Sequence, residues 1–190
     1  MSNVNAPRGL VPLRHNGGGV VRTNRYEIAS GLASNIFRGD PVIPVNTTNR
    51  INVATAGARL QGVFHGAEWT DVNGTPRFEK YWPTGTTVKT GTTAYAHVYD
   101  DPDIVFECQT SGTGAAADAG ACADLTFATV GSTITGQSGA QIDQTTVGAL
   151  AQLKLIKPVL RDATENAYGA NVKWEVMIAE HYMRGDMTTI

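Results

Sequence analysis

The chain has 190 residues, of which 42% are hydrophobic and 17% are charged, and its formal net charge is −2. Its apolar runs extend over only a few residues, which excludes a membrane-spanning helix. Its two cysteines, Cys108 and Cys122, are too few for a disulfide scaffold, and we expect them to be buried or incidental thiols.

The charges are distributed unevenly along the chain. Residues 1–89 carry ten basic and five acidic side chains, a net of +5. Residues 90–153 carry seven acidic side chains and no lysine or arginine, a net of −7. Such a chain offers complementary surfaces to its own copies or to a partner, unless folding mixes the two segments.

The first residues, MSNVNAPRGLVPLRHNGGGVVRTNR, do not have the composition of a compact element. They contain four arginines, two prolines and the run Gly17-Gly18-Gly19, and no acidic residue. We therefore expect residues 1–24 to form an extended N-terminal arm and residues 25–190 to form the folded domain. The arm lacks the apolar core of a secretion signal, so we expect synthesis in the cytoplasm of the cell.

Strand patterns begin directly after this arm. YEIA at residues 26–29 is a candidate strand, and the runs at residues 38–45 and 49–56 are typical of a hairpin. Pro41 and Pro44 indicate that the first of these runs is an edge strand or irregular. Residues 60–82 have the clearest hairpin pattern, in which Asn73-Gly74 predicts a tight type I′ turn.

Alternating apolar side chains predict further strands at residues 93–101, 103–109, 149–160 and 171–182. Residues 109–125 lack side-chain bulk and periodicity, which indicates a long loop. Residues 129–143 fit a short strand between turns. Many short strands without an amphipathic helix predict an all-β fold, a single β-barrel or β-sandwich domain with the extended N-terminal arm attached.

The sequence contains no catalytic or metal-binding signature. The histidines lack the short spacings of a metal site, although a spatial cluster of His65, His97 and an aspartate stays an alternative. The acidic run Asp100–Asp103 is interpreted as a turn, with a surface calcium site as the lesser alternative. A carboxylate pair for glycoside hydrolysis has only Glu68, Glu79 and Glu107 as candidates. We therefore expect no enzyme, no metal and no cofactor.

The basic N-terminal arm fits two kinds of partner. Its composition is that of a nucleic-acid-binding arm, but four arginines spread over twenty-five residues are a weak electrostatic footprint. An arm that folds onto a protein surface is equally consistent with the composition.

A set of motifs between residues 60 and 180 has a recognisable order. A Gly-Val strand precedes the aromatic hairpin, W-P-x-G follows at residues 82–85, and DDPDIVFECQ occupies residues 100–109. After a Gly/Ala-rich loop come T-G-x-S-G-x-x-I-D at residues 135–143 and N-x-x-W-x-V-x-I at residues 171–178. This order resembles virion structural proteins of tailed bacteriophages and, among them, capsid decoration (cement) proteins.

The resemblance implies a β-rich, non-enzymatic protein on the outer surface of the phage capsid, made in the host bacterial cytoplasm. It implies the major capsid protein as partner and a homo-oligomer, expected to be a homotrimer, with no direct contact to nucleic acid or membrane. On this interpretation the arm attaches to the capsid, because its arginines pair with capsid carboxylates while apolar side chains fill grooves. The expected attachment residues are Arg8, Leu10, Arg14, Arg22 and Arg25.

Two alternatives stay open from the sequence. One is another virion component, namely a head–tail connector, tail or fibre protein. The other is a carbohydrate-binding β-module, in which exposed aromatic rings would stack on sugars. The candidate rings for such a platform are Trp69, Tyr81, Trp82 and Trp174.

Overall fold

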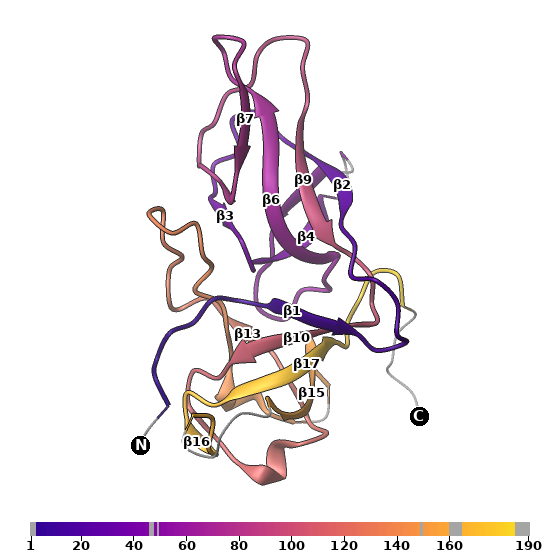
Figure 1. Ribbon diagram of the computed structural model, residues 1–190, viewed down its shortest axis with the longest axis vertical. Coiled ribbons are helices and arrows are strands. Elements are labelled where there is room, and N and C mark those ends of the chain that lie inside the picture. Colours follow the sequence, from indigo (N-terminus) through magenta and orange to yellow (C-terminus); the bar gives the residue numbers. More distant parts are fainter. Residues whose placement is uncertain (1–2, 46–47, 49, 149, 160–164, 185–190) are drawn as a thin grey trace.

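The computed structural model describes residues 3–45, 48, 50–148, 150–159 and 165–184, and it confirms the all-β fold. Five strands close into a barrel, and a separate five-stranded sheet lies below this barrel in Figure 1. The N-terminal segment crosses between the barrel and the sheet (Figure 1). In the described part of the chain, no helix has the length and apolarity that a membrane crossing requires.

The barrel is built from one contiguous stretch of sequence. Its strands pair in the order β4-β5-β2-β9-β6, and β4 also pairs with β6, which closes the ring. The strands are β2 (Asn24–Ile28), β4 (Pro41–Val45), β5 (Arg50–Val53), β6 (Gly62–Thr70) and β9 (Ala94–Tyr99), with β7 (Pro76–Glu79) added beside β6. The predicted alternation in β9 is confirmed, because Ala94, Ala96 and Val98 are buried in the barrel core.

The strand β4 only partly behaves as its prolines predicted. It pairs with β5 along its length, and its first two residues, Pro41 and Val42, also pair with β6. Beyond Val42, β4 pairs with β5 alone and is an edge strand, as predicted. Pro44 lies in this part and has no N–H to donate to a second strand.

The lower sheet draws its strands from both ends of the chain. They are β1 (Val11–His15), β10 (Ile104–Gln109), β17 (Lys173–Ile178), β15 (Leu153–Pro158) and β12 (Cys122–Ala123), in the order in which they pair. As the alternation predicted, Trp174, Val176 and Ile178 are buried in its core. All residues of β10 are buried, so this strand is covered on both faces.

Short elements add to these two parts. They are β3 (Ile36–Phe37) paired with β8 (Tyr81–Trp82), β11 (Thr113–Gly114) with β16 (Gly169–Ala170), β13 (Leu125–Thr126) with β14 (Gln141–Ile142), and two 3-10 turns, η1 (Ala116–Asp118) and η2 (Gln144–Thr146). Both cysteines are buried and free, as expected.

The hairpin of β6 and β7 is confirmed, but its predicted type I′ turn is wrong. In the described chain only Asn171 among non-glycine residues has a positive φ, so Asn73 does not. Instead Gly74, at φ +88°, donates its N–H to the carbonyl of Asp71, and the Asp71 carboxylate accepts from the N–H of Asn73 and Thr75. This side-chain acceptor fixes a type I-like turn that ends in a left-handed glycine.

The N-terminal segment is more structured than an arm composition predicted. Val11–His15 form β1, which pairs antiparallel with β10 at the edge of the lower sheet. Residues 1–24 were expected to form an extended arm; Val11–His15 are extended but belong to the lower sheet, because β10 supplies the ladder partner that the segment cannot supply itself. We refer to residues 3–15 as the strap.

Candidate functional site

The strap is held to the body by one buried side chain. Leu10 is 1% exposed and lies in the core of the lower sheet. Its backbone N–H donates to the carbonyl of Gly39 at 2.9 Å. Gly9, at φ +68°, passes so close to Gly39 that a Cβ there would lie 2.3 Å from the Gly39 oxygen. Where the strap passes between the barrel and the sheet, position 9 therefore requires a glycine and position 10 an apolar residue.

Ion pairs to two buried glutamates hold the strap from outside. Arg8 lies 3.5 Å from Glu107, and Arg14 lies 2.7 Å from Glu175. Glu107 and Glu175 stand opposite each other on β10 and β17. Two carboxylates at this spacing repel each other unless cations flank them. Additional lysines approach within 3.8 Å, Lys157 at Glu175 and Lys173 at Glu107.

The residues predicted to grip a capsid therefore have neighbours in their own chain. Leu10 is buried and does not reach a partner surface. Arg8 and Arg14 pair with the glutamates of the lower sheet, and Arg25 pairs with Glu68 on the barrel while lying 4.1 Å from the centre of the Tyr95 ring. Arg22 is exposed and has no ion pair in the described part of the chain. The structure brings these residues into no common site, and their role in attachment stays a prediction.

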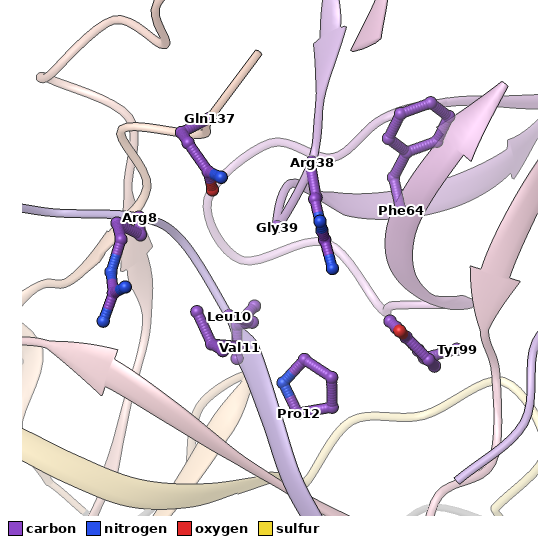
Figure 2. Close-up of a pocket in the computed structure, with 9 residues that line it drawn as sticks. All are labelled: Arg8, Leu10, Val11, Pro12, Arg38, Gly39, Phe64, Tyr99 and Gln137. Carbon is purple, nitrogen blue, oxygen red and sulfur yellow. The ribbon is translucent and has the colours of Figure 1, made fainter. Parts of the chain in front are cut away.

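A hollow of about 220 Å³ lies where the strap passes under the barrel. Figure 2 shows the Arg38 side chain reaching down toward Pro12 and Tyr99. The strap forms the floor, Tyr99 comes from the end of β9, and Gln137 comes from the loop between β13 and β14. We call this the junction hollow; its lining is Arg8, Leu10, Val11, Pro12, Arg38, Gly39, Phe64, Tyr99 and Gln137.

Arg38 differs from most arginines of the described chain in lacking a carboxylate partner. Ion pairs to Asp or Glu are formed by Arg8, Arg14, Arg25, Arg50, Arg77 and Arg184. Arg38 is half-buried, and no described carboxylate lies within ion-pair distance of it. Its positive charge acts on Tyr99 and His65 instead. Burial raises the pKa of Tyr99, and the charge and hydrogen bond of Arg38 oppose this rise.

His65 extends this basic region to the outer face of the barrel. Its Nδ1 lies 2.9 Å from the Tyr99 hydroxyl. Burial lowers the pKa of His65, and the charges of Arg38 and His97 lower it further. His65, Arg38 and His97 border a second hollow of about 400 Å³, which also reaches the exposed side chains of Glu79 and Lys80. We call it the outer hollow; Arg38 lines both hollows.

The lesser alternative from the sequence, a cluster of His65, His97 and an aspartate, is not found among the described residues, where the two histidines line the outer hollow without an aspartate. His65 contacts Tyr99, and Nε2 of His97 lies 3.6 Å from Glu68. Both histidines thus have ordinary partners on the surface of the barrel, which is the interpretation that the sequence favoured.

The loop between β13 and β14, residues 127–140, projects toward the barrel (Figure 1). Its backbone bonds to Arg38 on both sides, through Arg38 N–H to Gly136 and Ser138 N–H to Arg38. Asp40 anchors it, because the Ser138 hydroxyl donates to this buried carboxylate at 2.5 Å. Burial raises the pKa of Asp40 to about 6, against the hydrogen bonds from Ser138 and Phe37. We call this segment the β13–β14 loop.

Apolar side chains are exposed on the β13–β14 loop and on β7. Val130 is 81% exposed, Ile134 is 96% exposed and Phe78 of β7 is 74% exposed. The base of the loop packs beside the end of β7, since a Cβ at Gly136 would lie 2.9 Å from Cβ of Lys80. β7 and the loop lie on the same side of the molecule in Figure 1. Exposed apolar groups of this kind mark interaction surfaces when they occur together.

The side chains of the acidic turn, Asp100–Asp103, contact other groups of the chain. Side chains of His15, Asp101 and Asp103 lie close enough to suggest a metal site. Nδ1 of His15, however, accepts the N–H groups of Gly17 and Gly19, at 3.0 and 3.1 Å. Nε2 therefore carries the proton and donates to Asp101, and a protonated ring nitrogen does not ligate a metal. Arg184 already pairs with Asp103.

The remaining sequence candidates are structural. Trp69, Trp82 and Trp174 are at most 9% exposed, so the predicted sugar-stacking platform is wrong for all three. Tyr81 stacks on Phe37. Of the glycosidase candidates, Glu107 is buried against the strap and Glu68 pairs with Arg25.

Sequence reasoning missed the residues of the junction hollow other than those of the strap. Arg38 stands between Phe37 and Gly39 in a run that was interpreted as the start of a hairpin. Only the tertiary contact with Gln137, about a hundred residues later in the chain, gives Arg38 its position. Comparison of the chain with protein-family models, curated proteins and solved structures finds no match.

Proposed function

We propose that the chain is a structural protein of a tailed-phage virion, of the capsid decoration (cement) type. It binds the outer surface of the head and stabilises contacts between major capsid protein subunits. Like the decoration proteins that it resembles, it acts as a homo-oligomer, expected to be a homotrimer, without catalysis. Several weak contacts per copy, repeated over a shell, give firm attachment through valency.

The observation that carries this proposal is the face formed by the β13–β14 loop, β7 and the two hollows. This face combines exposed apolar side chains, Val130, Ile134 and Phe78, with a basic region around Arg38. An apolar contact beside polar groups is the composition of a protein–protein interface. The strap supports the face from below, because Leu10 and the ion pairs fix its position.

Copy number in the virion tests the proposal. Virions of the phage that encodes the chain are purified, and the protein is quantified against the major capsid protein by gel densitometry and located by cryo-electron microscopy. We expect hundreds of copies on the outside of the head. A dozen or fewer copies at the head–tail joint or tail would identify a connector or fibre component, and complete absence from particles would reject a virion role.

A pair of variants tests whether this face makes the attachment. Val130→Ser with Ile134→Ser removes the exposed apolar groups of the loop. We expect the double variant to fold normally and to bind heads at least tenfold more weakly, because two apolar side chains that are buried on binding no longer contribute their transfer free energy. Val4→Ser with Val20→Ser is the matched control, since these valines are also exposed but lie in the N-terminal segment. Equal loss in both pairs would contradict a role for this face.

A further inference from the structure

We propose that the junction hollow is a binding site for a carboxylate, supplied by an acidic side chain of a partner protein. Arg38 is the residue that receives it, and Tyr99 and Gln137 provide the additional polar contacts. The proposal therefore specifies that the partner segment that docks on the face described above carries an acidic side chain. It rests on the proposed function only for the identity of that partner.

The absence of an internal counter-charge at Arg38 is the first argument. Elsewhere in the described chain, arginines of the strap, barrel and lower sheet pair with carboxylates of the same chain. Exposed arginines need no such partner, because water solvates them. Arg38 is half-buried beside the strap, where fewer water molecules reach the guanidinium. An arginine in such a position binds a carboxylate strongly, through two parallel hydrogen bonds.

The shape and lining of the hollow are the second argument. Its volume of about 220 Å³ admits one side chain rather than a large ligand. The wall is apolar where Leu10, Val11, Pro12 and Phe64 form it, and the polar groups of the lining are Arg8, Arg38, Tyr99 and Gln137. Figure 2 shows the Gln137 and Arg38 side chains extending toward the same space above the strap. An apolar wall with few placed polar groups is the usual composition of a selective site.

The electrostatic environment is the third argument. The outer hollow adds Lys80, His65 and His97 to Arg38, against the carboxylate of Glu79 in its lining and that of Glu68, which lies 3.6 Å from Nε2 of His97. Asp40 does not neutralise Arg38, because its carboxylate faces Ser138 and the N–H of Phe37. Burial lowers the pKa of His65 most, and the nearby charges of Arg38 and His97 lower it further. A bound carboxylate would offset these positive charges, so binding and protonation of His65 support each other.

A protein carboxylate fits this site better than the phosphates of a nucleic acid. Nucleic acids bind along rows of cations that follow the backbone. In the strap, Arg8 and Arg14 already pair with Glu107 and Glu175, so no such row of unpaired arginines leads to the hollow. The exposed apolar groups of the neighbouring β13–β14 loop also favour a protein partner.

The test uses the full chain in solution and two short peptides. Acetyl-Leu-Glu-Leu-amide is the probe, and acetyl-Leu-Gln-Leu-amide differs from it only by the charge. Binding is followed by NMR, through the side-chain Nε–H signal of Arg38 and the ring signals of His65. We expect saturable shifts with the glutamate peptide, binding at least tenfold weaker for the glutamine peptide, and a rise in the pKa of His65 on binding.

Variants of Arg38 and Arg22, two arginines without a described carboxylate partner, separate the site from general charge. Arg38→Gln should abolish peptide binding and raise the pKa of His65, because the nearby positive charge is gone. Arg38→Lys should retain binding that is about tenfold weaker, since lysine keeps the charge but not the two-pronged geometry. Arg22→Gln removes an exposed arginine outside the hollow and should change neither quantity.

Three results would overturn the inference. They are equal binding of the two peptides, equal loss with Arg22→Gln, and inorganic phosphate or a DNA oligonucleotide binding more tightly than the glutamate peptide. Failure here is distinguishable from failure of the proposed function, because the virion measurement requires no peptide. If the protein is abundant on heads but does not bind the glutamate peptide, only the carboxylate site is rejected. If the protein binds the peptide but is absent from particles, only the virion role is rejected.

Discussion

The strap and the β13–β14 loop both cross between the barrel and the lower sheet, but opposite kinds of side chain anchor them. The strap inserts Leu10 into the core and pairs its arginines with buried glutamates. The loop is fixed by a buried polar contact between Ser138 and Asp40, and it exposes Val130 and Ile134. The strap has thus used its strongest binding groups within the chain, whereas the loop presents them outward.

This difference changes where a partner should be sought. An extended basic arm suggests a tether that grips a neighbouring protein. In this molecule the strap instead forms part of the folded core, and the loop and the hollow at its base are available for contact. Composition alone therefore does not identify the contact segment, and the exposure of the apolar residues distinguishes the two.

Leu10→Ala should have the largest effect on stability. Removing a fully buried leucine side chain costs about 2–5 kcal/mol, because a cavity remains in the core. Urea unfolding followed by tryptophan fluorescence measures this loss. Leu13→Ala is the control, since Leu13 is 41% exposed in the same strap and should cost much less. Similar losses for both variants would show that the strap has no specific anchor.

Asp40→Asn should change how stability depends on pH. The pKa of Asp40 is about 6 in the folded protein, above its value in the unfolded chain, so the folded state binds this proton more tightly. The resulting stabilisation is complete below about pH 4 and is lost as the pH rises through 6. The unfolding free energy of wild type relative to the variant should fall by about 1–3 kcal/mol from pH 4 to pH 7. A difference that is independent of pH would refute the raised pKa of this anchor.

Arg14→Ala should have an intermediate effect. It leaves Glu175 with Lys157 as its remaining cation at 3.8 Å, and we expect a loss of about 1–2 kcal/mol because Glu175 is buried while Arg14 is partly exposed. Denaturant titrations at low and high salt measure the loss and its screening. Arg22→Ala should be neutral, and an equal effect of both substitutions would mean that the strap is held by general charge only.

Val130→Ser with Ile134→Ser should have the smallest effect on stability, within about 0.5 kcal/mol, because exposed side chains contribute little to folding. Thermal unfolding measures this difference. A large destabilisation would place these residues in the fold and remove the contrast between loop and strap.

Periodicity in the sequence was sufficient to predict much of the fold. The alternation of Ala94, Ala96 and Val98, and of Trp174, Val176 and Ile178, predicted strands that the structure contains. The turn at Asn73-Gly74 was located correctly but given the wrong type. The side chain of Asp71, which turn statistics for two residues do not consider, decides the geometry.

The strap could not be predicted from its own residues. Leu10 stands between Gly9 and Val11 without any periodic pattern, and its burial depends on a groove that other parts of the chain form. The charge separation along the sequence was the one available signal. The basic and acidic segments do pair, but within the chain, as Arg8 with Glu107 shows.

The pairing of Val11 with Glu107 has a consequence for the order of folding. The barrel strands lie between Asn24 and Tyr99, so the barrel has all its strands before the lower sheet has more than its first. The strap is synthesised earliest, yet it has no ladder partner until Ile104–Gln109 have left the ribosome. During that interval Leu10 is exposed, and pairing over such a sequence separation is slow. Aggregation during synthesis should therefore depend on the strap more than on any other segment.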